Sequence, residues 1–371
     1  MSKELIGVIA IILLFVLLAG RVWVGLAMSI AGFVAIFALK GFTQAWTTLF
    51  GASFSNVCNY SLSVMPMFVL MGCIISETDI GSDLYKTMHK WLGNHKGGLA
   101  YATVAATGLL GAITGSQLTG AIVMSKVALP EMEKVNYKDT LSTGSIAAAS
   151  PLGILIPPST AFVLYGLLTE QSIGKLFISG IIPGVITVIV FFVVIFIICR
   201  RDPELGPKMG YKVPLKERMQ ALVKVLPILI LFALVMVGIY AGLCTATEAG
   251  ALGAFAALII TIVTKQMTVK KFMNSLKETA NLMGMIMLQM MGTYIFSTAL
   301  TYTGVTTALG RFVIGLNVPK FVIIIAIIIL YLILGCFLPE FPMIMLTVPI
   351  LYPFIQQLGF YLIWFVVLFY A

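Results

Sequence analysis

Two polar or helix-breaking segments interrupt otherwise apolar sequence. The first is the tetrapeptide Thr114-Gly115-Ser116-Gln117, and the second is SIAAASPLGILIPPST over residues 145–160. Proline and glycine break helices and free backbone carbonyls, and hard cations such as sodium prefer oxygen ligands. The two breaks therefore predict a site for a hard cation, built from the carbonyls of Gly115 and Gly153 and the hydroxyls of Thr114, Ser116, Ser150 and Ser159.

The double proline predicts a second kind of binding. A new helix is expected to begin just after it, and the N-terminus of a helix favours anions. Prolines and glycines also kink ordinary membrane helices, but four breakers beside a polar tip favour a binding site. The candidates from this segment are Ser150, Gly153, Pro157, Pro158, Ser159 and Thr160.

The first break divides residues 97–130 into two arms, Gly97–Ile113 and Leu118–Leu129. The second arm has about 12 residues, whereas a span needs about 20. Two short helices with a polar tip predict a re-entrant hairpin. Its tip must be buried in protein or line a watery cavity, because lipid cannot satisfy its backbone groups.

The composition around these segments indicates a membrane protein. Of the 371 residues, 60% are hydrophobic and 10% are charged, whereas about a quarter of the residues of a soluble domain are charged. We therefore expect an all-α polytopic membrane protein, most simply a secondary transporter. Five apolar spans are recognisable: 5–20, 22–39, 173–199, 222–242 and 321–336.

Charge placement gives these spans a direction. The formal net charge is +9, and the basic residues are concentrated in short loops between spans, which is the positive-inside pattern and argues against nucleic-acid binding. Residues 200–224 are predicted to be a cytoplasmic basic linker with a short surface helix. The five cysteines form no CxxC motif, so the sequence indicates no transition-metal site and no disulfide framework.

An internal repeat at an offset of about 220 residues relates Gly115 to Gly335. Near Gly335, LILGCFLPEFPMIMLTVPILYP predicts a second hairpin whose tip contains Gly335, Pro339 and Glu340. The counterpart of the double proline would lie beyond Ala371, so the chain is expected to be C-terminally incomplete. The expected parts are N-terminal scaffold spans (1–60), a first repeat (61–199, with hairpin 97–130 and broken helix 145–169), the linker (200–224) and a second repeat (225–371, with a hairpin over about 321–353).

Glu248 is an acidic residue at the start of an apolar stretch, in GLCTATEAG. Intramembrane acids are functional by default. Because Glu248 follows Thr245 near a helix start, it has a second interpretation, which is that it caps the helix.

Residues 111–184, GAITGSQLTGAIVMSKVALPEMEKVNYKDTLSTGSIAAASPLGILIPPSTAFVLYGLLTEQSIGKLFISGIIPG, resemble the large membrane subunit of TRAP (tripartite ATP-independent periplasmic) transporters, the DctM-like family. The earlier PMFVLMGCII and the later LGCFLPEFPMIMLTVPILYP also resemble that family. The resemblance implies a sodium-driven elevator transporter in the bacterial inner membrane, with sodium at the hairpin tips and broken helices. It implies import of an organic acid, such as a C4-dicarboxylate or sialic acid, from a periplasmic binding protein. It also implies a small four-helix membrane subunit, which we expect as a separate chain.

The sequence departs from that family in two ways. A second Thr-Pro-Pro motif is absent, and Leu338-Pro339-Glu340 stands where the family often has an Asp-containing tip. Other classes remain open: a sodium-coupled anion symporter of the same two-hairpin architecture without a binding protein, or an ion channel. The chain has no HExxH, GxSxG, Walker A or GxGxxG motif, so we expect no enzyme and no cofactor besides the coupling sodium ion.

Overall fold

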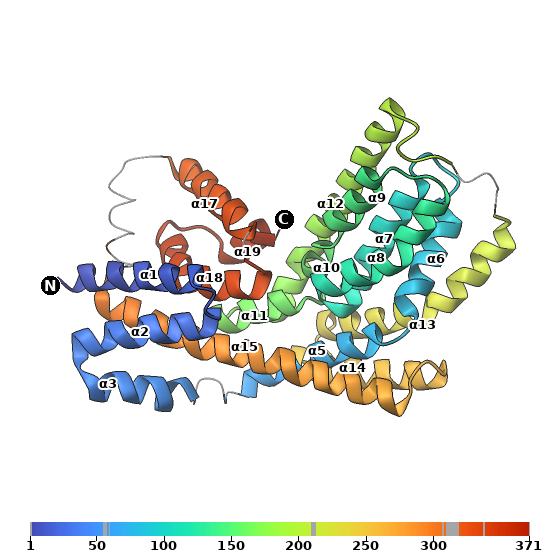
Figure 1. Cartoon of the computed structure of the whole chain (residues 1–371). Helices are drawn as coiled ribbons and strands as arrows, with labels where there is room; N and C mark the ends of the chain where they lie inside the picture. Colours follow the sequence, from blue (N-terminus) through green and yellow to red (C-terminus); the bar gives the residue numbers. More distant parts are fainter. Residues whose placement is uncertain are drawn as a thin grey trace. The chain divides into compact units, whose positions relative to one another are not determined.

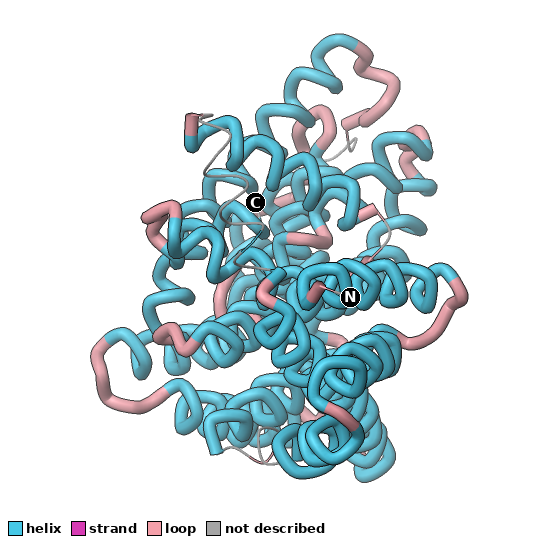
Figure 2. The backbone as a smooth tube through the Cα atoms, turned by 90° about the vertical axis from the view of Figure 1, so that its left-hand side faces the viewer, coloured by secondary structure: helices cyan, strands magenta, loops and turns pink. Residues whose placement is uncertain are grey.

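The structure, a computed structural model, describes residues 2–54, 58, 60–208, 213–305, 308, 319–336 and 338–370. All regular secondary structure in these ranges is helical, which confirms the all-α expectation (Figure 2). The chain divides into two compact units. The first is Met1–Ser63, Leu164–Gln171 and Asn281–Phe369, and the second is Val64–Val163, Ser172–Ala280 and Tyr370–Ala371.

The first unit contains the N-terminus of the chain (Figure 1). Its core lies where α1, α2 and α15 meet, around buried Leu14, Ala31 and Phe296. Gly32 permits the close approach of α2 and α15, because a Cβ atom there would lie 2.8 Å from the backbone nitrogen of Phe296. The helices with residues in this unit are α1 (Lys3–Ala19), α2 (Val24–Lys40), α3 (Phe42–Thr47), η1 (Thr48–Ala52), η2 (Tyr60–Ser63), α11 (Thr160–Thr169), α15 (Val269–Thr303), α17 (Lys320–Gly335), α18 (Glu340–Gln357) and α19 (Leu362–Tyr370).

The second unit contains both predicted breaks of the first repeat. Its core surrounds α7 and includes buried Leu99, Val104, Leu152 and Cys199. Its α5 and α14 pack side by side, as do α6 and α7. Besides the first half of α11 and the start of α15, its helices are α5 (Val64–Ser76), α6 (Ile80–Leu92), α7 (Gly98–Thr114), α8 (Gln117–Lys134), α9 (Asp139–Ala149), α10 (Leu152–Leu155), α12 (Ile173–Arg201), α13 (Leu215–Tyr240) and α14 (Ala246–Val263).

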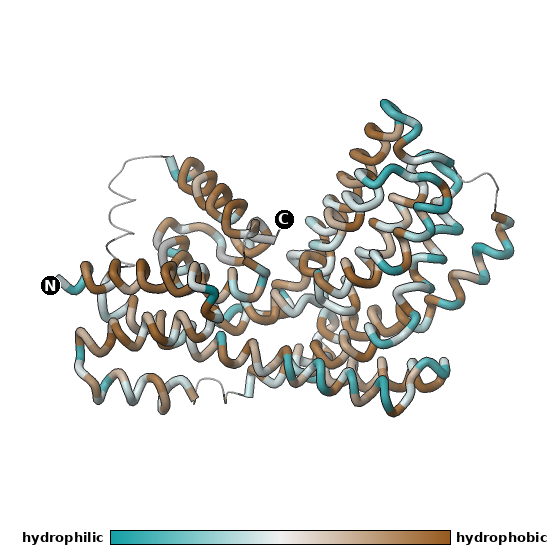
Figure 3. Tube along the Cα trace, in the orientation of Figure 1, coloured by the Kyte–Doolittle hydropathy of each residue, from teal (hydrophilic) through white to brown (hydrophobic). Residues whose placement is uncertain are grey.

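Several helices are long and apolar enough to cross a bilayer. Within the described residues these are α12, α13, α14 and α15. Two bent helix pairs are also long and apolar enough when each pair is taken as one span. The pair of η2–α5 with α6 bends by 66°, and the pair of α9–α10 with α11 bends by 43°. Apolar residues run along α12 and α17 (Figure 3), and only 11% of the apolar window of α12 is buried. An apolar surface that is exposed in this way can contact lipid, as expected for a helix of a polytopic membrane protein.

Two helices are longer than the sequence suggested. The short surface helix expected within 200–224 is the beginning of α13, which starts directly after Pro214 and continues through Pro227. The second arm of the first hairpin, expected over 118–129, continues through Pro130 to Lys134. In this last turn, beyond the apolar residues 118–129, Lys134 and Glu131 form an ion pair at 2.7 Å.

Candidate functional site

The first predicted tip is a two-residue break between α7 and α8. Gly115 caps α7 in the left-handed conformation (φ 61°), and its N–H donates to the Gly111 carbonyl at 2.7 Å. Ser116 caps α8, because its Oγ accepts from the backbone N–H of Thr119 at 3.4 Å. Thr114, the last residue of α7, is buried, and Gln117, the first residue of α8, is half-buried. The C-terminus of one helix and the N-terminus of the next therefore lie within two residues of each other.

The second predicted break separates α9, α10 and α11. The chain leaves α10 at Ile156 in an extended conformation and continues through Pro157 and Pro158. Ser159 then caps α11, since its Oγ accepts from the N–H of Phe162 at 3.4 Å. At the earlier interruption, Ser150 donates its hydroxyl to the Ile146 carbonyl at 2.7 Å. The predicted broken helix is thus three helical pieces, and its last piece starts where the sequence suggested.

The two breaks are in direct contact. The Thr160 hydroxyl donates to the Gly115 carbonyl at 2.8 Å, and both residues are buried. A Cβ atom on Gly115 would lie 3.0 Å from the Pro158 carbonyl oxygen, and one on Gly153 would lie 2.9 Å from that of Ser116. Five predicted site residues therefore meet here, although their binding roles stay predictions.

Glycines allow this contact, and two of them were not among the predicted site residues. Gly111 faces Gly153 so closely that a Cβ atom would overlap the Cα of Gly153. On another side of the tip, a Cβ atom on Gly72 of α5 would lie 2.6 Å from the Thr114 carbonyl oxygen. In the sequence, Gly72 stands out as a small residue among bulky apolar ones. That pattern alone does not show which residue the glycine packs against.

The helix termini give the junction an electrostatic character. Its carbonyl-bearing ends are those of α7 and α10, and its N–H-bearing ends are those of α8 and α11. Helix C-termini carry partial negative charge and N-termini carry partial positive charge. Carbonyl and hydroxyl oxygens at one place can bind a hard cation, while the N-termini of α8 and α11 can stabilise an anion. No group of three or more His, Cys, Asp or Glu residues that could hold a metal ion occurs in the described ranges.

A tyrosine after α8 anchors the base of the hairpin. The Leu99 N–H at the start of α7 donates to the Tyr137 hydroxyl at 3.1 Å. Burial raises the pKa of Tyr137 to about 12, so its hydroxyl stays protonated at neutral pH. Both arms of the hairpin are therefore tied together at the end opposite the tip.

The second predicted tip lies in the first unit, between α17 and α18. Gly335 ends α17 and is exposed, Pro339 is exposed, and Glu340 begins α18 and is half-buried. The two helices are joined by a hydrogen bond from the Tyr331 hydroxyl to Thr347 Oγ1, at 2.9 Å. Residue 337 of this tip lies outside the described residues.

A cavity that the sequence did not predict lies in the same unit. Its volume is about 340 Å³, and it is lined by α15, α18 and residues 167–170. Its polar lining residues include Glu170, Thr293, Tyr294 and Tyr352. The Tyr352 hydroxyl also donates to the Thr169 carbonyl at 3.2 Å. Glu170 itself has a positive φ (56°).

Comparison with known protein families shows which family the chain belongs to. Residues 11–371 match the family described as "Tripartite ATP-independent periplasmic transporter, DctM component". The chain belongs to the DctM family of TRAP transporter large permeases. The resemblance seen in residues 111–184 is thereby confirmed. The expectation that the protein is a transporter and not an enzyme is confirmed as well, because the DctM family is one of membrane transporters.

Individual relatives of this DctM-family chain differ in length and substrate. It is 29% identical over 313 residues to the isethionate TRAP transporter permease protein DctMQ of Oleidesulfovibrio alaskensis, covering 83% of the chain and 48% of that protein. It is 27% identical to the C4-dicarboxylate large permease DctM of Rhodobacter capsulatus (94% and 82% covered). It is 28% identical to the sialic acid large permease SiaM of Vibrio cholerae (91% and 80% covered). The chain thus spans about half of the first relative and about four fifths of the other two.

Glu248 of this DctM-family chain lies at the first turn of α14, where it is exposed. Its Oε2 accepts from the Thr245 N–H at 2.7 Å, and its own N–H donates to Thr245 Oγ1 at 3.3 Å. These reciprocal bonds form a capping box, which satisfies two donors at the start of a helix. Of the two interpretations of Glu248, the geometry favours helix capping.

Proposed function

We propose that this chain is the large permease subunit of a sodium-coupled TRAP transporter that imports an organic acid anion. The observation that carries the proposal is the contact between the Thr160 hydroxyl and the Gly115 carbonyl. It joins two helix breaks whose carbonyls, hydroxyls and N-termini provide ligands for a cation and for an anion in one place. Discontinuous helices with this arrangement are typical of binding sites in secondary transporters.

In this proposal the coupling sodium ion binds at the first junction. Its ligands are drawn from Thr114, Gly115, Ser116, Ser150 and Gly153. The ends that begin with Gln117 and Thr160 orient N–H groups toward the substrate anion, and Pro157, Pro158 and Ser159 set the start of the second of these ends. By the repeat, Gly335, Pro339 and Glu340 are the proposed binding residues of the second hairpin tip.

The transport cycle that we propose is of the elevator type. Residues 61–199 and 225–371 act as inverted repeats, with re-entrant hairpins over 97–130 and about 321–353, and residues 1–60 belong to the scaffold. The protein lies in the bacterial inner membrane with the basic segment 200–224 in the cytoplasm, as the positive-inside rule predicts. The bends in the helix pairs of the first repeat support this proposal, since elevator and rocking transporters use broken helices.

The proposed partners are a small four-helix membrane subunit and a periplasmic binding protein that delivers the substrate. The relatives' names suggest which acids to test: isethionate, C4-dicarboxylates and sialic acid. All three classes are organic anions. The shared chemistry supports an anion substrate, whichever of these acids this chain transports.

Uptake in proteoliposomes tests the proposal. The chain is reconstituted with its small subunit and binding protein, and uptake of radiolabelled succinate, isethionate and N-acetylneuraminate is measured under an inward sodium or potassium gradient. We expect uptake of at least one acid with the sodium gradient only. Uptake at the same rate with either gradient would contradict sodium coupling, and uptake without binding protein would favour an independent symporter.

Direct sodium binding tests the site. The chain in detergent is expected to unfold at a higher temperature in sodium chloride than in potassium chloride, because a ligand that binds only the folded state stabilises it. Ser116→Ala should remove most of this difference. Ser172→Ala is the matched control, since Ser172 caps α12 in the same way. Equal sodium responses of the two variants would remove the first tip from the site.

A further inference from the structure

The residues that directly follow α12 are tied to the base of the first hairpin. Gly97 is the residue before α7, and its N–H donates to the Gly206 carbonyl at 2.9 Å. Lys138 is the residue before α9, and its N–H donates to the Leu205 carbonyl at 3.2 Å. Residues 202–206, which we call the strap, therefore contact the starts of two helices through two consecutive carbonyl groups.

These bonds take the place of side-chain caps at the two helix starts. The N–H groups at the start of a helix have no partner within the helix, and neither Gly97 nor Lys138 provides a side-chain cap. Lys138 adds an ionic contact, because its Nζ lies 3.6 Å from Asp202 Oδ2 and 3.8 Å from Glu204 Oε2. Lys138 thus holds the strap through both its backbone and its ammonium group.

The sequence of the strap suits this contact. Asp202 Oδ1 accepts from the Glu204 N–H at 3.1 Å, which forms a turn across Pro203. Gly206 is buried, and a Cβ atom on it would lie 3.0 Å from the Cα of Gly97. Glycine at position 206 therefore allows the strap to pass this close to the start of α7.

The two helices that the strap joins lead to the proposed sodium ligands. α7 ends directly before Gly115, whereas α9 ends directly before Ser150, and Gly153 lies in the next helical piece. α7 and α9 pack against each other, and at their far ends Gly111 is in close contact with Gly153. A shift of one helix along the other would change the spacing between the Gly115 and Gly153 carbonyls. Ligands that are already in place bind more tightly, because binding does not have to order them.

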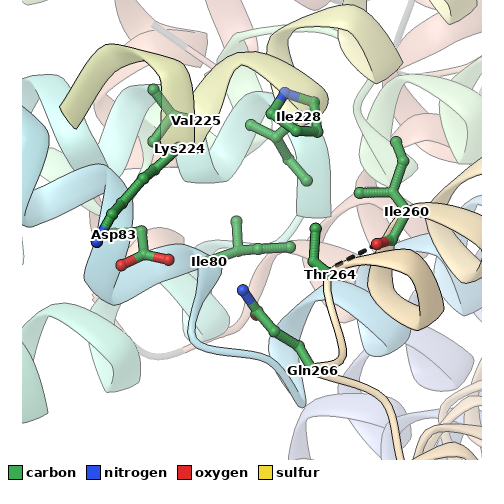
Figure 4. A pocket seen from close by; sticks show the side chains of 9 residues that line it. Ile80, Asp83, Lys224, Val225, Ile228, Ile260, Thr264 and Gln266 are labelled. Carbon is green, nitrogen blue, oxygen red and sulfur yellow. Dashed lines mark hydrogen bonds between the residues drawn. The ribbon is translucent and has the colours of Figure 1, made fainter. Parts of the chain in front are cut away.

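Another lysine of the second unit offers a comparison. The Lys224 side chain of α13 extends toward the Asp83 carboxylate of α6, beside a hollow of about 20 Å³ that both residues line (Figure 4). Lys224 is exposed, as Lys138 is, and it also approaches a carboxylate of a different segment. None of the proposed sodium ligands comes from α6 or α13, so Lys224 is a matched control for Lys138.

We propose that the strap is a positioning element of the sodium site. It holds the starts of α7 and α9 together and so keeps the carbonyls of Gly115 and Gly153 at the spacing that the ion requires. Lys138 and Gly206 are its positioning residues, and neither touches the ion. This inference rests on the proposed function, because it needs sodium to bind at the first junction.

The sodium dependence of thermal unfolding tests the proposal. The melting temperature of the chain in detergent is measured over a series of sodium chloride concentrations, with potassium chloride keeping the ionic strength constant. The readout is the sodium concentration that gives half of the maximal rise. Lys138→Gln should raise this concentration about two- to fivefold, as expected for the loss of exposed ion pairs. Gly206→Ala should raise it further, because the methyl group displaces the strap from Gly97.

Two variants should keep the wild-type sodium concentration: Lys138→Arg, which retains the charge, and the control Lys224→Gln. A merely structural strap would lower the melting temperature of Lys138→Gln and leave its half-maximal sodium concentration unchanged, and this result would overturn the proposal. An equal increase in Lys224→Gln would also overturn it. If Gly206→Ala does not fold, Lys138→Gln still decides.

The same measurement separates this inference from the proposed function. A wild-type chain whose melting temperature does not respond to sodium would overturn both. A normal sodium response in the wild type that Lys138→Gln retains unchanged would overturn the role of the strap alone.

Discussion

The Thr160 hydroxyl donates a hydrogen bond to the Gly115 carbonyl across 45 residues of sequence. Thr160 is the first residue of α11, and Gly115 is the left-handed cap that ends α7. The bond therefore connects the tip of the first hairpin to the start of the last piece of the broken helix. Because the Gly115 carbonyl is buried, its hydrogen bond contributes to stability as well as to the geometry of the proposed sodium site.

Thr160→Val keeps the shape of the side chain and removes the donor. The Gly115 carbonyl would lose this partner in a buried place, which costs about 1–3 kcal/mol, so we expect a lower melting temperature and a weaker sodium response. Thr160→Ser, which keeps the hydroxyl, should recover most of both. Thr143→Val is the control, since the exposed Thr143 donates its hydroxyl to the Asp139 carbonyl of its own helix. If Thr143→Val and Thr160→Val have the same effects, the bond has no special role.

The breaks of the first repeat were predictable from sequence because they depend on local chemistry. Gly115 ends α7 since it can take a positive φ, and the double proline at 157–158 prevents helix until α11 begins. The contact between the two breaks was not predictable in detail. It depends on Gly111, Gly153 and their close approach, and glycine in a sequence gives no sign of what it faces in the fold.

The lengths of α8 and α13 show another limit of the sequence. The sequence predicts that the second arm ends at Leu129, directly before Pro130, but the helix continues for another turn to Lys134. Proline removes one N–H donor without preventing the next turn, so it does not always end a helix.

The cavity that includes Glu170 and Tyr294 was not predicted from the sequence for a different reason. Its residues come from three distant segments, and only tertiary packing brings them together.

Gly153→Ala tests the close approach at the junction. The new methyl group would lie 2.9 Å from the Ser116 carbonyl oxygen, and overpacking of this kind typically costs about 1–3 kcal/mol. We expect a lower melting temperature and reduced sodium-driven uptake. Gly144→Ala, on the exposed side of α9 with open space around it, should be neutral or slightly stabilising, because alanine favours helix. A stable and active Gly153→Ala variant would contradict the described contact.

Substitutions of Glu248 test whether this carboxylate stabilises the helix or takes part in transport. Because Glu248 is half of a capping box with Thr245, Glu248→Gln should keep the cap and retain uptake, since glutamine also serves at this position. Glu248→Ala should lower the melting temperature slightly while uptake per folded protein stays the same. If Glu248→Gln abolished uptake in a folded protein, the carboxylate would have a transport role that the capping geometry does not explain.

The second hairpin offers a measurement of how firmly its two arms are joined. Tyr331 of α17 donates to Thr347 Oγ1 of α18 at 2.9 Å, and Thr347 in turn donates to the Met343 carbonyl at 2.7 Å. A double-mutant cycle with Tyr331→Phe and Thr347→Val isolates the bond between the arms, because residues in contact show a coupling energy that distant residues do not. We expect a coupling of about 1 kcal/mol in unfolding experiments. The cycle is repeated with Tyr361→Phe, at a tyrosine that is 70% exposed, in place of Tyr331→Phe. Coupling to Thr347 in the control cycle as large as in the first would show that the measured energy does not come from this hydrogen bond.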